Sequence, residues 1–364
     1  MKVARMFAYA GIAAALFQQA AVAQAPPYRF QMVGAEDTTI RFGFLAQPQV
    51  ESLEQAGDGG TDTTVSFRRL RLMAGGDLTE RLSFFVESDS PNLGKELADG
   101  THAADIFLQD AYVAYRFRPE FVLTGGMILV PLSRNSGQSA ATLLPVDYGP
   151  CAFASSGITR SKVGRDYGVL ARGYVRDHLE YRAGLFRGNR NHDGDFPYRY
   201  LFRVVYYPFE ADTGYFYGGP SLGKKRILGI GASIDRQGTY SANSVDVFLD
   251  QPLAGGDSVT VRADWIRYDQ QTPFLDQQTL LPTQNDWLLE GNYYFRRAKL
   301  APFIQFSNRD LTGPGAPDSR KIQGGVAWYP SGNRVNLKAG LGRLIETGQD
   351  DRTQFVVQGQ FFFY

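Results

Sequence analysis

The stretch from Val65 to Ser88 reads VSFRRLRLMA, then GGDLTER, then LSFFVES, and it decides the class of fold. In its first segment the apolar residues Leu70, Leu72 and Ala74 occupy every second position, and Arg69 and Arg71 take positions of the other parity. The last segment alternates in the same way. A period of two places apolar side chains on one face of a strand and polar side chains on the other. Two such segments joined by a short polar turn predict a β-hairpin.

The same unit recurs to the end of the chain, and no linker or shift in composition interrupts it. We therefore expect one domain over residues 38–364, built from antiparallel strands. Sixteen strands are predicted, at residues 38–53, 64–75, 81–89, 106–117, 120–130, 165–175, 178–187, 199–208, 226–236, 240–250, 257–268, 285–296, 299–307, 320–329, 334–345 and 353–364.

The connections between these strands alternate between long and short. Two breaks interrupt the rule: the connection at 209–225 is long where a short one is expected, and that at 237–239 is short. Short periplasmic turns and long extracellular loops are typical of an outer-membrane barrel. Such a sheet must close on itself, because lipid offers no partner for an unpaired backbone group. The sequence thus predicts an all-β, 16-stranded antiparallel up-and-down transmembrane β-barrel with short periplasmic turns and long extracellular loops.

The first 23 residues predict a cleaved secretory signal peptide. Lys2 and Arg5 form a basic start, Met6–Phe17 is apolar, and Ala21-Val22-Ala23 precedes the expected cleavage point. The apolar run is too short for a membrane-spanning helix. We expect export to the bacterial outer membrane, with residues 24–37 as an irregular periplasmic lead-in.

The composition agrees with a barrel and argues against some other classes. The chain has 26 Phe, 20 Tyr and 40 Gly, and membrane barrels use aromatic girdles and glycines at strand bends. Its 38 basic and 37 acidic residues nearly balance, so charge gives no indication of nucleic-acid binding. The single cysteine excludes an internal disulfide framework.

Three stretches resemble the phosphate-selective porin O and P family. They are Phe67-Arg68-Arg69-Leu70-Arg71-Leu72 with its Gly75-Gly76 turn and Glu87, then Gln109-Asp110-Ala111-Tyr112-Val113 with Gly125, Gly126 and Val130-Pro131-Leu132, and then Gly164-Arg165-Asp166-Tyr167-Gly168-Val169 with Leu179-Glu180-Tyr181 and Gly184-Leu185-Phe186-Arg187-Gly188-Asn189. The resemblance implies a sixteen-stranded porin, a homotrimer, whose third loop folds into the channel. Phosphate selectivity belongs to some members of that family.

The longest connection, residues 131–164, is the candidate constriction. Long loops without regular structure are usually functional, and this one is rich in small residues. We expect it to fold into the barrel, although a solvated surface loop is the alternative. Its candidate constriction residues are Arg134, Asp147, Tyr148, Arg160 and Lys162.

The polar faces of the strands predict the lining of the lumen. Its basic members are Arg69, Arg71, Arg116, Arg172, Arg182, Arg199, Arg203, Arg262, Arg296, Lys321 and Lys338, and its acidic members are Glu87, Asp89, Asp110, Asp166, Glu180, Asp246, Asp264 and Glu290. Arginine forks bind oxyanions, and charged rings set ion preference. Many of these charges share a face of one strand, so we expect them to pair across the wall. The predicted anion preference is therefore weak at most.

Nothing in the sequence predicts catalysis, a cofactor or a metal site. The motif His-Glu-x-x-His and a complete P-loop are absent from the sequence. Asn189–Asp195 resembles the start of a calcium loop, but position twelve is Tyr200 where that loop needs Glu. The expected partners are outer-membrane lipid and small hydrophilic or anionic solutes, which cross passively. The alternatives are a dedicated phosphate or polyphosphate channel, a structural or adhesion barrel, and a soluble secreted β-protein.

Overall fold

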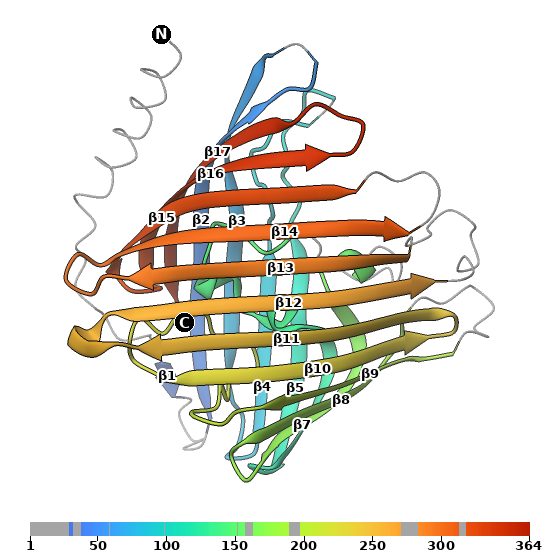
Figure 1. Ribbon diagram of the computed structural model, residues 1–364. Helices are drawn as coiled ribbons and strands as arrows, with labels where there is room; N and C mark the ends of the chain where they lie inside the picture. The colour runs from blue at the N-terminus through green and yellow to red at the C-terminus, as the bar shows by residue number, and fades with distance from the viewer. Residues whose placement is uncertain are drawn as a thin grey trace.

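The protein forms one sheet that is rolled into a closed barrel (Figure 1). The structure is a computed structural model, and it describes residues 29–31, 38–57, 59–97, 99–150, 152–156, 163–188, 197–270, 283–312 and 318–364. Within these residues, no helix has the length and apolar character needed to cross a membrane. The predicted signal peptide, residues 1–23, lies outside the described residues.

All sixteen predicted strands are present, and each pairs antiparallel with its neighbours in the chain. Their bounds are β2 (Thr39–Glu54), β3 (Thr61–Asp77), β4 (Leu82–Asp89), β5 (Phe107–Arg118), β6 (Phe121–Leu129), β7 (Arg165–Val175), β8 (Leu179–Phe186), β9 (Arg199–Tyr206), β10 (Ile227–Gln237), β11 (Tyr240–Pro252), β12 (Ser258–Gln270), β13 (Thr283–Tyr294), β14 (Leu300–Thr312), β15 (Ser319–Ser331), β16 (Val335–Glu346) and β17 (Arg352–Phe363). The described helices are short: α2 (Arg134–Gly137), η1 (Ala140–Thr142), η2 (Ala154–Ser156) and η3 (Ala254–Gly256).

The barrel closes where its last strand meets its first. β17 pairs antiparallel with β2, from Gln354 opposite Leu53 to Phe363 opposite Phe44. Beyond that point the edge of β2 continues, and the short strand β1 (Arg29–Gln31) pairs with it there. The predicted lead-in, residues 24–37, is therefore not wholly irregular. Three residues are too few to show a period of two, so the sequence pattern did not reveal β1.

Side chains alternate between the outer face of the barrel and the interior along each strand. In β13, Trp287 and Leu289 are about half exposed, at 50% and 51%, while Glu290 between β12 and β14 is 1% exposed. The outward apolar residues and inward polar residues are the pattern of a barrel in lipid. β14 extends five residues past its predicted end to Thr312, because its polar residues still pair with β13. Backbone pairing needs no apolar side chains, so strands continue beyond the alternating pattern.

The two ends of the barrel differ in their connections. At the turn end, short turns such as 119–120 and 295–299 join the strands, and Figure 1 shows the β11–β12 and β13–β14 turns together at the left. At the loop end, connections such as 90–106 and 130–164 are long. Both predicted breaks in this alternation are present. Residues 207–226 form a long connection at the turn end, and residues 238–239 form a two-residue turn at the loop end.

The last side chain of the chain points into the barrel. Phe85 lies edge-on to the Tyr364 ring with centroids 5.5 Å apart, and Arg41 lies over the same ring at 5.3 Å. The ring fits because Gly43 and Gly75 lack side chains, and a Cβ on either would lie within 3 Å of Tyr364.

Gly126 in β6 is a position that only glycine satisfies. Its φ of +137° belongs to a region that L-residues rarely adopt, and a Cβ there would lie 2.2 Å from the carbonyl oxygen of Ala111 in β5. The neighbouring Gly125 has ordinary backbone geometry, and a Cβ would meet nothing closer than Val169 at 3.7 Å. The two glycines therefore form a matched pair for testing the strand pairing.

We predict that Gly126→Ala destabilises the barrel while Gly125→Ala does not. The first substitution combines a strained φ with a clash against β5, at a cost of about 1–3 kcal/mol or more. Refolding yield, measured as the fast-migrating compact form on unheated detergent gels, should fall for Gly126→Ala alone. Equal yields from the two variants would contradict the close approach of β5 and β6.

Candidate functional site

The connection that follows β6 enters the barrel from the loop end and turns back inside it. Ser133 caps the one-turn helix α2 through a capping box with Ser136. The backbone N–H groups of Arg134 and Asn135 donate to the wall carboxylates of Asp246, at 3.3 Å, and Asp264, at 2.8 Å. Carboxylates are favourable partners for the free N–H groups at a helix N-terminus. The start of this inserted loop is thus fixed against β11 and β12.

The rest of the inserted loop is held by strands β16 and β17. Gln360 of β17 donates to the carbonyl of Ala141 at 2.8 Å. Lys338 of β16 donates to the carbonyls of Leu143 and Pro145, at 2.5 and 2.9 Å. Side chains of the wall therefore satisfy backbone groups that a loop leaves unpaired, which is the condition for burying a loop.

Asp147 is the main charged anchor of the inserted loop. Its two carboxylate oxygens accept from Arg68 and Arg69 of β3, each at 2.5 Å. Burial raises the pKa of Asp147, but the two guanidinium groups outweigh it, and the pKa lies well below the ordinary value for aspartate. Tyr148 follows, and its hydroxyl donates to the carbonyl of Gln138 at 2.6 Å. Burial also raises the pKa of Tyr148, which keeps this hydroxyl protonated.

A second segment enters the barrel from the turn end. It is the connection 207–226 between β9 and β10, and its residue Tyr217 is completely buried. The backbone N–H of Tyr217 donates to the carbonyl of Gly137 at 2.9 Å, and its carbonyl accepts from Ser139 at 3.0 Å. These bonds form a parallel bridge between the two inserted segments. Loops that enter from opposite ends therefore meet inside the lumen.

Arginines fix this meeting point. The guanidinium of Arg134, in the inserted loop, donates to Asp212 at 2.7 Å and to the carbonyl of Gly218 at 2.8 Å. From the wall, Arg182 of β8 donates to the carbonyl of Tyr215 at 2.8 Å. Arg203 of β9 donates to the Tyr217 hydroxyl at 2.9 Å. The guanidinium fork suits such contacts because its five donors reach several acceptors at once.

Most arginines of the wall are paired with carboxylates. The pairs are Arg71 with Glu87 and Asp89, Arg165 with Asp110, Arg182 with Glu180, Arg199 with Asp235 and Asp166, Arg203 with Asp246, and Arg262 with Glu290 and Asp264. These side chains are almost fully buried within the barrel interior. A buried charge without a partner is costly, so paired charges of opposite sign are the stable arrangement.

The sequence-predicted site residues occupy several places. Arg69, Arg71, Arg116, Arg172, Arg182, Arg203 and Arg262 lie on inward strand positions, and Arg134, Asp147 and Tyr148 lie in the inserted loop. Arg160 and Lys162 fall outside the described residues, as does Asn189–Asp195. Arg296, predicted in the lining, is exposed in the turn after β13, because that strand ends at Tyr294.

Sequence reasoning missed the residues of the second segment. Asp212, Tyr215 and Tyr217 were not predicted to lie in the lumen, although the unusual length of this connection was noted. Arg41 was missed as well, because it lies near the start of β2 with an exposed Phe42 beside it. The sequence feature that could have revealed the second segment is the length of the connection 207–226, because the other connections at the turn end are short.

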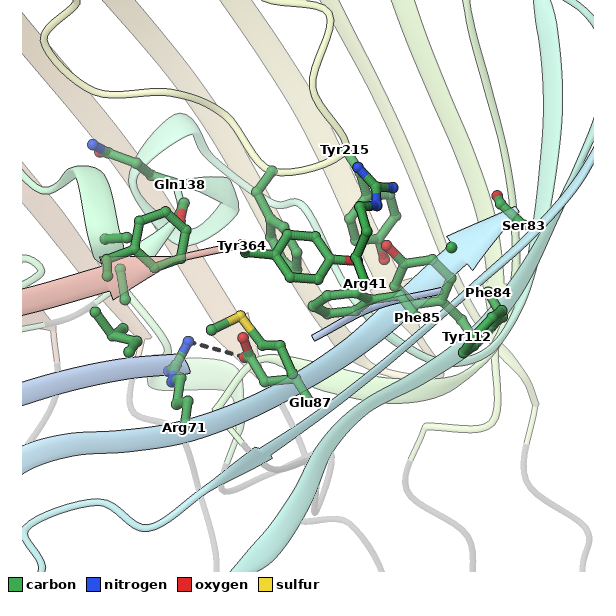
Figure 2. A pocket seen from close by; sticks show the side chains of 18 of the residues that line it. Arg41, Arg71, Ser83, Phe84, Phe85, Glu87, Tyr112, Gln138, Tyr215 and Tyr364 are labelled. Atoms are coloured by element: carbon green, nitrogen blue, oxygen red, sulfur yellow. Dashed lines mark hydrogen bonds and ion pairs between the residues drawn. The ribbon is translucent and has the colours of Figure 1, made fainter. Parts of the chain in front are cut away.

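A cavity remains between the inserted segments and the wall formed by β2 to β5. Its volume is about 410 Å³, and Figure 2 shows the residues around it. Arg71 and Glu87 form an ion pair at one side. Arg41, Phe85, Tyr112 and Tyr364 gather at the other. This cavity leaves an open part of the lumen beside β2–β5. In the described part of the chain, no cluster of His, Cys, Asp and Glu is placed to bind a metal ion.

A closed sixteen-stranded barrel with an apolar outer face and a polar, narrowed interior defines an outer-membrane channel of the porin class. A family model described as phosphate-selective porin O and P matches residues 46–243. The chain belongs to this family, which confirms the resemblance seen in the sequence.

Solved structures with the same fold are porins and channels of the outer membrane. Salmonella typhi OmpF in complex with daunomycin is 12% identical, with a TM-score of 0.62 over 92% of this chain and all of that one. Pseudomonas putida OprB is 9% identical, with a TM-score of 0.63 over 89% and 94% of the two chains. The outer membrane channel DcaP of Acinetobacter baumannii is 9% identical, with a TM-score of 0.55 over 93% and 100%.

One curated relative matches part of the chain. It is an uncharacterized protein of Aquifex aeolicus, 26% identical over 147 residues. The match spans 38% of this chain and 30% of that relative's length.

We predict that Asp147→Asn loosens the inserted loop. The substitution leaves Arg68 and Arg69 side by side without their shared carboxylate, which should cost roughly 3 kcal/mol of folding free energy. Single channels should become noisier, and the urea unfolding midpoint should fall. Asp99→Asn is the control, because Asp99 is exposed and binds its neighbour Thr101. Equal noise and equal midpoints in Asp147→Asn and the parent protein would show that these ion pairs do not hold the loop.

The same anchor predicts a pH response. Because the folded-state pKa of Asp147 is lowered, the ionised anchor contributes stability above the ordinary aspartate pKa of about 3.9 and loses it only as pH falls through the lowered value. Current noise from the parent channel should therefore stay constant from pH 7 down to about 4. Noise that rises across this range would contradict a lowered pKa.

We also predict that shortening the second segment widens the path. Replacing Ala211–Leu222 by Gly-Gly-Ser removes the contacts with Arg134, while Glu210 and Arg226 stay joined by a backbone hydrogen bond of 3.1 Å. Conductance of the folded, heat-modifiable variant should rise. A folded variant with unchanged conductance would mean that the second segment does not obstruct the path.

Proposed function

We propose that this protein is a general diffusion channel for small hydrophilic solutes and ions, with a weak anion preference at most. The observation that carries the proposal is the pairing of lumen arginines with carboxylates. A paired arginine presents little net charge to a passing ion, so the number of arginines overstates the field in the pore. Arg71, Arg203 and Arg262 each share their charge with at least one carboxylate.

A dedicated phosphate or polyphosphate channel is the second candidate. It needs several free cations at one depth of the pore to replace the hydration of a strongly charged anion. Arg69, a candidate for such a role, is committed to Asp147 and to Gln47. Arg134 is committed to Asp212. The family name alone does not favour phosphate over other anions in this chain.

The proposed setting follows from the fold and the family. The barrel lies in the bacterial outer membrane with its turn end in the periplasm and its outward apolar faces in contact with lipid. Residues 1–23 act as a cleaved signal peptide. A homotrimer is supported by the similar Vibrio cholerae OmpT, which is described as a trimer form and has a TM-score of 0.56 at 11% identity. Transport by diffusion requires no catalytic residue and no cofactor.

A barrel that serves as a structural or adhesion element is the alternative from another class. The interior contains two inserted segments, which narrows the path. Such a barrel would present its loop end as the active surface and would conduct poorly.

We predict large single-channel steps with a small reversal potential in a potassium chloride gradient. The paired charges should give a preference for chloride over potassium of only a few-fold, which a planar bilayer measures directly. Inorganic phosphate added at millimolar concentration should leave the current unchanged. Strong anion selectivity with phosphate block would instead establish a dedicated anion channel. Absence of steps from folded protein would establish the structural alternative.

A further inference from the structure

Two adjoining cavities lie between the inserted segments and the wall formed by β2 to β7. The larger one, of about 410 Å³, extends from Arg71 toward the turn end. The second, of about 290 Å³, is lined by residues of the β5–β6 and β7–β8 ends. Both cavities are lined by Ser83 and Arg116, so they adjoin at these side chains and together make up the space beside β2 to β7.

Three arginines that line this space differ from the paired arginines of the wall. Arg41, Arg116 and Arg172 have no carboxylate partner among the described residues, and the buried Nε atoms of Arg41 and Arg172 have no hydrogen-bond partner there. Each can donate to a ligand without breaking an existing ion pair. The facing carboxylates do not cancel them: Glu87 is bound to Arg71, and Asp77, Glu120 and Asp177 lie on the exposed rim.

Aromatic rings line the same space. The Tyr112 and Tyr215 rings have centroids 4.8 Å apart, and Phe85 lies 5.5 Å from Tyr112 and 6.2 Å from Phe216. Tyr364 completes the group at 5.5 Å from Phe85. Figure 2 shows Arg41 among the rings of Tyr364, Phe85, Tyr112 and Tyr215.

The arginines and the rings are in direct contact. Arg41 lies over the ring of Tyr364 at 5.3 Å, and Arg172 lies over the ring of Tyr215 at 5.5 Å. A guanidinium group that stacks on a ring keeps its outward N–H donors available for an oxyanion. A ligand with a flat apolar body and one charged end matches this arrangement, because the body can pack on the rings while the charge meets the arginines.

We propose that this space is a binding subsite for amphipathic organic anions, specifically ring compounds that bear a carboxylate. The proposal rests on the channel function proposed above and names a solute class for it. Inorganic phosphate fits the subsite poorly, because ring faces cannot replace the hydrogen bonds of its hydration shell. The subsite lies at the turn end, where solutes that have passed the inserted loop enter the periplasm.

The test compares two monoanions that differ by a ring. Benzoate and acetate are titrated on both sides of single channels of the full-length protein in planar bilayers, with chloride as the current carrier. Benzoate should reduce the chloride current at a concentration about tenfold below that of acetate, because the ring adds apolar burial and aromatic contact. Inorganic phosphate, the third probe, should act no more strongly than acetate.

Variants locate the effect. Arg41→Gln and Arg172→Gln should each raise the half-blocking benzoate concentration roughly fivefold to tenfold, as expected for loss of a charge-assisted hydrogen bond. Phe85→Leu should raise it about threefold by removing one ring contact. Arg81→Gln is the matched control, because Arg81 is an exposed arginine of the β3–β4 turn at the same end and does not line the space. It should leave the benzoate block unchanged.

The outcomes separate this inference from the channel function. Open channels that benzoate and acetate affect equally, or a benzoate block that survives both arginine variants, overturn the subsite and leave the channel intact. Phosphate block stronger than benzoate block shows a simple anion site and also overturns it. Folded protein without channels overturns the proposed function and this inference together.

Discussion

The structure depends on one constraint: no backbone N–H or C=O group that faces lipid can remain unpaired. The pairing of β17 with β2 removes the edges that a sheet otherwise leaves open. Once the sheet is closed, the period of two fixes which side chains face lipid and which face the interior. Leu70, Leu72 and Ala74 of this stretch lie on the outward face, and Arg69 and Arg71 lie inward. The functional side chains of this protein face the lumen as a result of this alternation, because the polar face of each strand is directed inward.

Closing the sheet brings many charged side chains together in the interior, where arginines and carboxylates form ion pairs. A guanidinium group removed from bulk water is stable only with acceptors around it, so Arg71 and Arg262 lie beside carboxylates on the next strand, and Arg203 reaches a carboxylate two strands away. The same requirement fixes the inserted segments, because Arg134 binds Asp212 and Asp147 binds two arginines of β3. Electrostatics that stabilise the barrel therefore also determine the width of the path. We therefore expect a substitution in one of these pairs to change stability and conductance together.

The sequence predicted the strands well and the site incompletely, for a physical reason. Strand position depends on local alternation and turn residues, so even β9 and β10 were located despite the unusual connection between them. The ion pairs depend on register between strands: Arg203 meets Asp246 across β10, although 43 positions separate them in the chain. The alternation in the sequence shows that Arg203 faces the interior, but it does not show that Asp246 is its ion-pair partner. The path of 207–226 is also set by contacts from distant elements, chiefly Arg182 and the inserted loop.

Two inserted segments meet inside the barrel. Their position affects how ion selectivity can be inferred from the charged residues of the lumen. In a lumen without inserted segments, a passing ion would experience all of the lining charges. Because acidic and basic residues are nearly equal in number, such a pore would have almost no ion selectivity. Here the segments bind strands β8 to β12 and also β3, β16 and β17, and an open cavity lies between them and the wall of β2 to β5. In the proposed channel, paired arginines contribute little beside β2 to β7, and the few arginines that keep free donors, Arg41, Arg116 and Arg172, set the local field. Selectivity in such a channel depends on which charges escape pairing along the open path, and the total number of arginines is a poor guide to it.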